Sequence, residues 1–261
     1  MTAGRYIFDA SHATERDRLR QLTAFFEPGT RRLLETVGVT LGWRCLEVGT
    51  GVGTTAEWLA ERVGPAGHVT ATDIDLRLAE GLRRENVELR HHDIVSDPLE
   101  EAAFDLAHAR LLLMHLPERV AALHKIVAAV KPGGWVVIED FDFRTWGHFD
   151  PPSEVQQRSK AAVAALFERA QIDTELGLRL PRMLTGAGME DVRAEGRCGV
   201  NGTGSATFES MALMLLQQRD RLVASGLISS ADIDAAIAEA RSGEARWGYS
   251  PIMVAAWGRR R

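Results

Sequence analysis

The run Glu47-Val48-Gly49-Thr50-Gly51-Val52-Gly53 constrains the fold more than any other part of the sequence. It follows a short apolar stretch, 43–48, and precedes a stretch with helical character, 54–63, that ends at Gly64 and Pro65. Alternate glycines let the backbone turn sharply and let a ligand approach the main chain, while the N-terminus of a following helix offers free N–H groups. We therefore expect a strand, a tight turn and a helix, with a ligand-binding site over the turn.

The same alternation of short apolar stretches and helical segments continues along the chain. Strands are expected at 68–72, 87–91, 104–107, 135–139, 192–196 and 252–257, and helices near 76–82 and over 118–130. Strands that alternate with helices indicate right-handed crossovers and a mainly parallel sheet.

The segments outside this alternating region are expected to be mostly helical. Apolar side chains recur at helical spacing over 15–26, Pro28 and Gly29 then break the helix, and Thr30 is placed to cap a second one. After the fifth strand, helices are expected over 154–170, from Pro181 to Gly186, over 208–223 and over 231–241, the last with Ser230 as its N-cap.

No linker-like stretch divides the sequence, so we expect a single domain, 1–261. Within it we expect N-terminal helices that form a lid (1–40), a cofactor-binding core (41–141), and substrate-cap helices with closing strands (142–261).

Composition narrows the functional classes. Lys and Arg number 31 against 36 for Asp and Glu, whereas nucleic-acid binders generally carry the opposite balance because phosphate neutralisation supplies much of their affinity. Cys45 and Cys198 have no second Cys near them, which argues against a zinc site or a disulfide framework, so no metal is expected. Residues 1–20 contain no signal-like apolar stretch and no later run approaches a membrane span. A cytoplasmic protein without nucleic-acid or membrane partners is expected.

Acidic residues follow the next two strands. Asp73 closes the strand at 68–72, about twenty residues beyond the glycines, where a carboxylate can accept from both ribose hydroxyls of a nucleotide. The alternative is a surface Asp that caps the next helix. His92-Asp93-Ile94 follows the strand at 87–91, and the alternative for its Asp is a turn residue. A dinucleotide turn reads G-x-G-x-x-G, and Thr54 stands where its third glycine would be, so NAD or FAD is not favoured.

An acidic residue before G-x-G-x-G resembles motif I of class I S-adenosylmethionine-dependent methyltransferases. Phe104-Asp105-Leu106-Ala107-His108-Ala109-Arg110, followed by His115-Leu116-Pro117-Glu118, is similar to the fourth strand and next turn of the ubiquinone- and menaquinone-biosynthesis-type members. Val130-Lys131-Pro132-Gly133-Gly134-Trp135 is similar to the turn before their fifth strand. The resemblance spans 41–139 and implies a Rossmann-like α/β fold. That fold has a seven-stranded, mostly parallel sheet with helices on both faces, here with helical cap additions.

The resemblance implies S-adenosylmethionine as the cofactor. It assigns the methionine ammonium to Glu47, the ribose to Asp73, and the adenine to Asp93 with an apolar neighbour. The residues expected to contact the cofactor are Glu47, Gly49, Thr50, Gly51, Gly53, Asp73, Ile74, His92, Asp93, Ile94 and Arg110. Arg110 stands where many relatives carry a small polar residue, so it either holds the methionine carboxylate or an anionic substrate, or has a capping or surface role.

Methyl transfer is an in-line displacement that needs aligned, dry reactants, and a general base is optional. If the acceptor must lose a proton, the candidate bases are His115, Asp142 and His148, together with Asp140, and each also fits a purely structural role. Tyr6, Phe143, Arg144 and Trp146 are expected to contact the substrate.

Asp150-Pro151-Pro152-Ser153 resembles the amine-binding motif of DNA adenine methyltransferases, but it follows the fifth strand and ends in Ser instead of an aromatic residue. It is expected to begin a helix.

The function expected is methyl transfer from S-adenosylmethionine to O, N or C of a small-molecule acceptor. Two alternatives stay open. One is an RNA or protein methyltransferase, which needs a basic groove formed only in three dimensions. The other is a domain that binds S-adenosylmethionine without transferring its methyl group.

Overall fold

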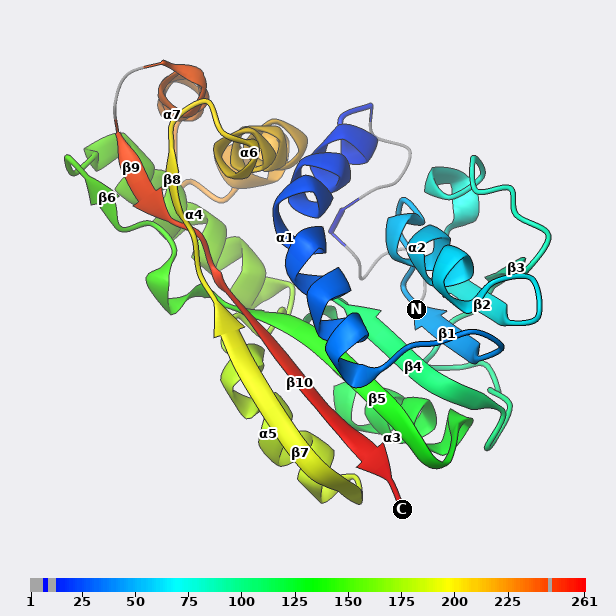
Figure 1. Cartoon of the computed structure of the whole chain (residues 1–261). Helices are drawn as coiled ribbons and strands as arrows, with labels where there is room; N and C mark the ends of the chain where they lie inside the picture. Colours follow the sequence, from blue (N-terminus) through cyan, green and yellow to red (C-terminus); the bar gives the residue numbers. More distant parts are fainter. Residues whose placement is uncertain (1–6, 9–12, 244–245) are drawn as a thin grey trace.

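The structure, a computed structural model, describes residues 7–8, 13–243 and 246–261. Its centre is a sheet with the strand order β3-β2-β1-β4-β5-β10-β7 (Figure 1). The strands are β1 (Arg44–Val48), β2 (His68–Asp73), β3 (Val87–His91), β4 (Phe104–Arg110), β5 (Val130–Asp142), β7 (Met189–Arg197) and β10 (Ile252–Arg260). The pairs from β3 to β5 are parallel, and β10 runs antiparallel to β5 and β7. The expected seven-stranded, mostly parallel α/β fold is confirmed.

Helices cover both faces of this sheet, because successive side chains of a strand point to opposite faces and both sets are apolar. On one face, Cys45 of β1 packs with Leu34 of α1 (Glu15–Val37) and Leu59 of α2 (Thr54–Val63). On the other face, Leu46 packs in a cluster with Ile126 of α3 (Arg119–Ala129). The helix α5 (Leu176–Gly186) packs against β5 and β10 and lies behind them in Figure 1.

A second group of elements stands beyond the carboxyl end of β5. It contains α4 (Glu154–Arg169), α6 (Ala206–Ala224), α7 (Ser230–Arg241) and a small sheet of β6 (Phe149–Asp150), β9 (Trp247–Tyr249) and β8 (Val200–Gly202). Helix α6 packs against α1, α4 and α7, so this second group of elements is joined to the N-terminal helix (Figure 1). Among the described residues, none of the helices combines the length and apolar character needed to cross a membrane.

The expected break at Pro28 and Gly29 is wrong, because α1 runs without interruption from Glu15 to Val37. A proline inside a helix removes a backbone hydrogen bond, so tertiary contacts must offset its cost. Thr30, expected to be a cap, lies inside this helix, where its hydroxyl donates to Glu139 of β5 at 2.8 Å. Gly29 gives room to Arg197, whose guanidinium would lie 2.4 Å from a Cβ at this position.

Three other expectations at element ends need correction. The helix expected near 76–82 is a single 3-10 turn, η1 (Leu76–Leu78). The helix expected to start at Pro181 begins earlier, at Leu176, because Leu176 and Leu180 are both buried. Ser229, not Ser230, caps α7 by accepting from the Asp232 N–H at 3.0 Å. The Asp150-Pro151-Pro152 run lies before α4, whose N-cap is Ser153.

Candidate functional site

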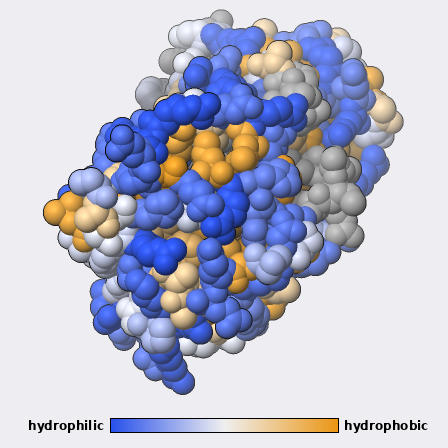
Figure 2. Space-filling model, turned by 90° about the vertical axis from the view of Figure 1, so that its right-hand side faces the viewer, coloured by the Kyte–Doolittle hydropathy of each residue, from blue (hydrophilic) through white to orange (hydrophobic). Residues whose placement is uncertain are grey.

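A cavity of about 630 Å³ opens at the carboxyl ends of β1, β2 and β4 and extends beneath α1 toward α4 and α6. The strand order reverses between β1 and β4, and ligands of open α/β sheets bind at such a reversal. In the face shown in Figure 2, apolar side chains reach the surface within a frame of hydrophilic ones. The walls of the cavity differ in character. We call the part lined by 47–52, 54–55, 73–75, 77–78, 91–94 and Arg110 the polar half. We call the part lined by α1, α4, α6, Phe141, Phe143 and Trp146 the aromatic half.

The glycine turn forms the floor of the polar half. Gly49 and Gly51 have φ values of 77° and 54°, and a Cβ on Gly49 would lie 3.3 Å from the Leu112 side chain. Such backbone angles strain residues with a Cβ. The N–H groups of Gly49 and Thr50 donate to the Thr72 carbonyl, and that of Gly51 donates to Asp73 at 2.9 Å. The Thr50 hydroxyl is buried against the cavity with no hydrogen-bond partner among the described residues.

Asp73 lies in the wall of the polar half. One carboxylate oxygen accepts from the Gly51 N–H and the other from the Asp75 N–H at 3.1 Å, so each oxygen retains acceptor capacity. Burial raises the pKa of Asp73 against the effect of these N–H bonds. Capping of the following turn, the alternative for Asp73, is performed by Asp75, which accepts from the Arg77 N–H at 3.1 Å.

His92, Asp93 and Ile94 also line the polar half. Asp93 accepts from the Val95 N–H at 2.9 Å, so it acts as a turn residue and faces the cavity at the same time. Ile94 is buried, and His92 contacts the Pro98 carbonyl through Nε2 at 3.1 Å. Of the expected cofactor contacts, Gly53 is the one absent from the cavity wall; it caps the N-terminus of α2 with φ 84°.

A chain of buried polar groups lies beneath the polar half on the α1 face of the sheet. We call it the buried ladder, and it consists of Glu27, Thr30, Glu47, His108, Arg110, Glu139 and Arg197. Glu47 and His108 face each other on adjacent strands, with Oε2 and Nδ1 2.6 Å apart. Their side chains are 3% and 0% exposed, so water does not screen this contact.

The rest of the ladder joins α1 to β4, β5 and β7. Arg110 pairs with Glu27 at 2.9 Å and donates to the Thr30 hydroxyl at 2.9 Å. Glu139 accepts from Thr30 and from Arg197, each at 2.8 Å. Burial raises the pKa of Glu27, but the charges and hydrogen bonds of Arg110 and Arg31 together outweigh it, and the pKa lies below its usual value. Arg110 therefore lines the cavity with its charge already paired.

Sequence reasoning missed every ladder member except Glu47 and Arg110. The available signal was a polar residue at alternate positions of an apolar strand, as in His108 and Arg110 of β4 and Glu139 of β5. Alternate positions share one face of a strand, so these side chains necessarily meet beneath the same covering helix.

The aromatic half is built from edge-to-face ring contacts. Centroid distances are 5.1 Å from Phe26 to Phe141, 5.3 Å from Phe141 to Phe143 and 5.5 Å from Phe143 to Trp146. Phe8, Phe167, Met114, Met211 and Met214 add to the apolar lining, as do Leu19 and Leu22 of α1.

Few polar groups enter the aromatic half. Arg18 donates two 2.7 Å bonds to Glu15 of the same helix, and its guanidinium carbon lies 4.0 Å from the centre of the Phe8 ring. Thr207, Ser210 and Arg221 enter from α6. This half can therefore hold a largely apolar molecule with a few directional polar contacts.

Among the candidate bases, His115 reaches the cavity, and burial, together with the charge on Arg18, lowers its pKa to about 3. The structure does not bring Asp142 or His148 to the cavity. Asp142 is buried and bonded to Arg144, and His148 contacts the Thr145 carbonyl through Nδ1 at 2.9 Å. Asp140 also lies outside the lining, where it accepts from the Leu113 N–H at 3.1 Å and burial raises its pKa well above the usual value.

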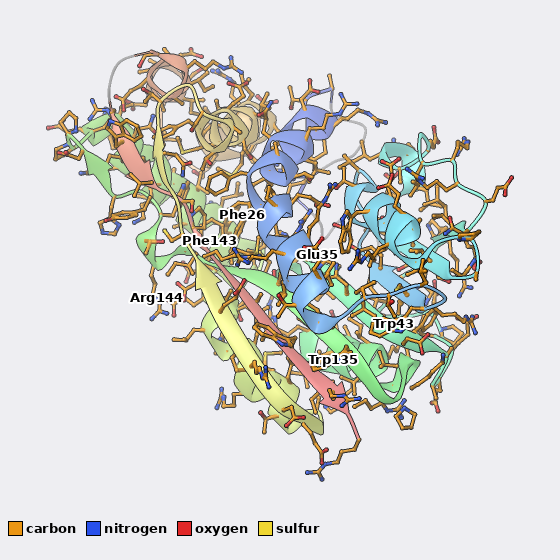
Figure 3. All side chains as sticks on the ribbon, in the orientation of Figure 1. Phe26, Glu35, Trp43, Trp135, Phe143 and Arg144 are labelled. Carbon is orange, nitrogen blue, oxygen red and sulfur yellow. The ribbon has the colours of Figure 1, made fainter. Side chains whose placement is uncertain are left out.

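Of the expected substrate residues, Phe143 and Trp146 line the aromatic half. Arg144 does not, because its guanidinium pairs with Asp142 and is half exposed; Figure 3 shows it at the outer side of the molecule, with Phe26 and Phe143 inside. Tyr6 lies outside the described residues.

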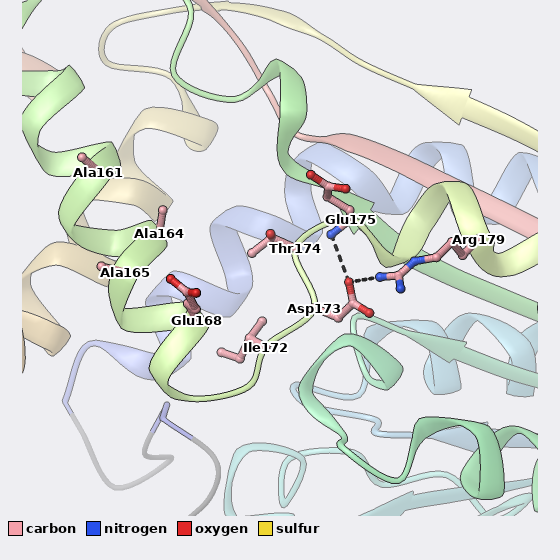
Figure 4. A pocket seen from close by; sticks show the side chains of 9 residues that line it. All are labelled: Ala161, Ala164, Ala165, Glu168, Ile172, Asp173, Thr174, Glu175 and Arg179. Atoms are coloured by element: carbon pink, nitrogen blue, oxygen red, sulfur yellow. Dashed lines mark hydrogen bonds and ion pairs between the residues drawn. The ribbon is translucent and has the colours of Figure 1, made fainter.

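A second hollow, of about 690 Å³, lies between α4 and the start of α5 (Figure 4). One of its acidic groups is satisfied locally, since Asp173 accepts from the Glu175 N–H at 3.3 Å and pairs with Arg179. It lies away from the glycine turn, and nothing in its lining matches the sequence motifs.

Within the described ranges, no cluster of His, Cys, Asp or Glu is arranged to hold a metal ion.

Comparisons with known proteins agree with this geometry. Residues 10–190 match the profile of a family described as a methyltransferase domain. The chain is 33% identical over 128 residues to the demethylmenaquinone methyltransferase of Staphylococcus aureus. That alignment covers 46% of this chain and 53% of the relative, so the chain spans about half the length of the curated relatives it matches.

Two solved structures share the fold. Phosphoethanolamine N-methyltransferase 2 of Haemonchus contortus, in complex with phosphomonomethylethanolamine and S-adenosylhomocysteine, has a TM-score of 0.61 and 17% identity, covering 98% of this chain and 60% of that chain. The [4+2]-cyclase SpnF has a TM-score of 0.51 and 21% identity, covering 88% of this chain and 81% of that chain. At these identities the likeness concerns the fold.

Proposed function

The chain belongs to the methyltransferase-domain family, and from this premise we propose that it is an S-adenosylmethionine-dependent methyltransferase acting on a small molecule. The observation that carries the proposal is the continuity of the cavity, since one space joins the polar half to the aromatic half. A cofactor in the first half would meet an acceptor in the second without crossing bulk water.

The residues of the polar half fit this cofactor. The Thr50 hydroxyl has no hydrogen-bond partner in the described part of the chain, and it and the N-terminus of α2 are donors suited to a carboxylate. Glu47 is an acceptor suited to an ammonium. Asp73 retains acceptor capacity on both oxygens, which suits two ribose hydroxyls. His92, Asp93 and Ile94 offer polar and apolar surfaces for a base.

The bound cofactor would supply a methyl group on a positively charged sulfur. The protein itself aligns the methyl donor with the acceptor and keeps water away from both. The polar half fixes the donor through Glu47, Thr50 and Asp73, while the rings of Phe143, Trp146 and Phe167 close the other half against water. Holding two reactants in line accounts for much of the rate of such a displacement.

We propose that the acceptor is nucleophilic enough to react without a general base from the protein. His115 lines the cavity with its ring edge-on to Phe8 of the aromatic half, and a pKa of about 3 makes its imidazole a weak base. Asp142 and His148 lie elsewhere. An acceptor atom that ionises readily, or an uncharged amine, fits these surroundings better than an alcohol that needs a strong base.

The cavity also supports the division into 1–40, 41–141 and 142–261. Its polar half is lined by 47–110, and its aromatic half chiefly by α1 and by residues beyond Asp140. We propose that the core binds the cofactor and the two flanking segments select the acceptor.

The test has two stages. Calorimetry with S-adenosylhomocysteine and with NAD should detect binding of the first at micromolar concentrations and none of the second. Incubation with S-adenosylmethionine and a panel of small apolar acceptors should then yield S-adenosylhomocysteine by mass spectrometry. Binding of NAD alone would refute the cofactor.

The two alternatives have their own outcomes in this test. Cofactor binding without turnover on any acceptor would favour a domain that does not transfer methyl groups, as the fold it shares with a cyclase allows. Salt-dependent RNA binding would favour a macromolecular acceptor, against the net charge of −5. The cytoplasmic location stays a prediction, which fractionation of the source cells would test.

A further inference from the structure

The buried charges of the ladder do not balance unless the Glu47–His108 pair holds a proton. Three carboxylates, Glu27, Glu47 and Glu139, face two guanidinium groups, Arg110 and Arg197. At the outer edge, Glu27 also meets Arg31, and Arg197 also meets Glu195, which in turn pairs with Arg32. These three outer side chains reach solvent, which screens their charges, so they do not neutralise the buried members. A buried cluster with uncompensated charge is costly, and one proton held by the Glu47–His108 pair makes the buried members neutral. Burial raises the pKa of Glu47 too, which favours keeping that proton within the pair.

The surroundings of His108 support a shared proton. Its Nδ1 lies 2.6 Å from Glu47, whereas its Nε2 is buried with no hydrogen-bond partner among the described residues. Burial alone would favour neutral imidazole, but the Glu47 carboxylate and the more distant Glu139 raise the pKa of His108. Arg110 acts in the opposite direction, and the thiol of Cys45 is neutral because burial raises its pKa.

Glu47 is the member of this pair that meets the cavity. It lines the polar half, whereas His108 is fully buried behind it. A positively charged group that enters beside Glu47 would be a second cation on the same carboxylate. Two cations on one buried carboxylate repel each other, and His108 is the one that can become neutral.

We infer that His108 carries a proton in the ligand-free protein and loses it when the ammonium of the cofactor's methionine part arrives beside Glu47. The Nε2 proton leaves for solvent, while the Nδ1–H continues to donate to the Glu47 carboxylate. His108 is thus a positioning residue: it holds Glu47 in place and keeps the ladder neutral with and without the cofactor. The inference rests on the proposed function, because it assumes that S-adenosylmethionine or its product binds here.

The consequence is measurable as proton release. Binding that releases one proton strengthens as pH rises, by up to tenfold per pH unit between the pKa values of the bound and free forms. Calorimetry of S-adenosylhomocysteine binding in two buffers of different ionisation enthalpy should report about one proton released per site near neutral pH.

A variant separates His108 from the other titratable groups of the cavity, Asp73 among them. In His108→Gln, the amide N–H₂ still donates to Glu47 but carries no ionisable proton, so binding should persist while release disappears and the affinity loses its pH dependence. The control is His148→Gln, a histidine outside the cavity, which should release the proton as the unchanged protein does. Equal release from His108→Gln and the unchanged protein would overturn the inference.

A spectroscopic measurement decides the matter even if His108→Gln fails to fold. In the unchanged protein labelled with ¹⁵N-histidine, the His108 ring should show an imidazolium signal without ligand and a neutral one with S-adenosylhomocysteine. A neutral ring before addition would refute the inference alone. Failure of S-adenosylhomocysteine to bind at any pH would instead refute the proposed cofactor, whatever the state of His108.

Discussion

The polar and aromatic halves of the cavity are held in different ways. In the polar half, side chains and backbone N–H groups bond to one another across β1, β2 and β4, and the buried ladder fixes them from beneath. In the aromatic half, rings from α1, α4 and the segment after β5 touch edge to face, with few directional bonds. A cavity wall held by hydrogen bonds and ion pairs tolerates few substitutions, because each one leaves a buried polar group without its partner. A wall of packed rings tolerates substitutions that conserve side-chain volume, and these can change the shape of the cavity. Under the proposed function, the cofactor site is therefore fixed by its bonds, and the acceptor site is open to reshaping.

The largest effect should come from breaking the ladder. Arg110→Met leaves the Glu27 carboxylate buried without its main cation and should lower the free energy of unfolding by about 3 kcal/mol. This is the lower end of the range for such pairs, because Arg31 also contacts Glu27. Urea denaturation of the ligand-free protein measures it.

The control for this prediction is Arg158→Met, which removes a 2.7 Å pair with Asp232 at the surface. Exposed pairs are worth about 1 kcal/mol or less, so the control should change stability far less. If the two variants lose the same stability, the ladder has no special role in holding the polar half.

The next largest effect should fall on cofactor affinity. Asp73→Ala removes both the expected ribose acceptor and the bond that holds the Gly51 N–H, and should weaken S-adenosylhomocysteine binding by about 1–3 kcal/mol. Asp73→Asn keeps one oxygen for Gly51 and should lose less. An unchanged dissociation constant in both variants would remove Asp73 from the cofactor site.

A smaller effect is expected from reshaping the aromatic half. With an acceptor in hand, Trp146→Phe should lower turnover by roughly tenfold, or about 1.4 kcal/mol in the barrier, because the smaller ring leaves the acceptor loosely held. Cofactor affinity should stay within a few-fold of the unchanged protein. Trp135→Phe, on β5 beneath Arg259 and outside the cavity, is the matched control. Parallel loss of cofactor binding and turnover would show that the two halves are not separable.

The smallest effect should appear in the pH dependence of turnover. A pKa lowered to about 3 keeps His115 neutral from pH 5 to pH 8, so His115→Gln should leave the shape of the pH–rate profile unchanged. The folded state resists protonating this ring, so its contribution to stability falls only as pH drops from about 6.5, the usual pKa of His, toward 3. Disappearance of a limb of the profile in His115→Gln would instead identify His115 as the base.

Local patterns were sufficient for the core of the fold. The glycine turn, the acidic strand ends and the alternation of strands and helices predicted the sheet, and the structure places Glu47, Asp73 and Asp93 on one cavity wall. These patterns involve residues that are close in the sequence, so they can be recognised from a single sequence without a structure.

What sequence reasoning missed depends on contacts between distant residues. Pro28 and Gly29 are helix-breaking by local preference, but Arg197 packs on Gly29 and Thr30 bonds to Glu139, 109 positions away, so the helix continues. Asp142 and Arg144 were expected to reach the site, yet they satisfy each other at its outer side. The fold decides which polar groups pair with each other. It thereby also decides which polar groups remain available to a ligand.

Helix α1 takes part in both halves, since Leu19 and Leu22 line the aromatic half while Glu27 and Thr30 bond to the ladder two turns later. Each residue of a helix advances its side chain by about 100° around the axis. One inserted or deleted residue between Leu22 and Glu27 would therefore turn either the cavity side chains or the ladder side chains away from their partners. If the flanking segments select the acceptor as proposed, point substitutions along the first turns of α1 would change it, whereas the length of the helix between the two halves is closed to variation.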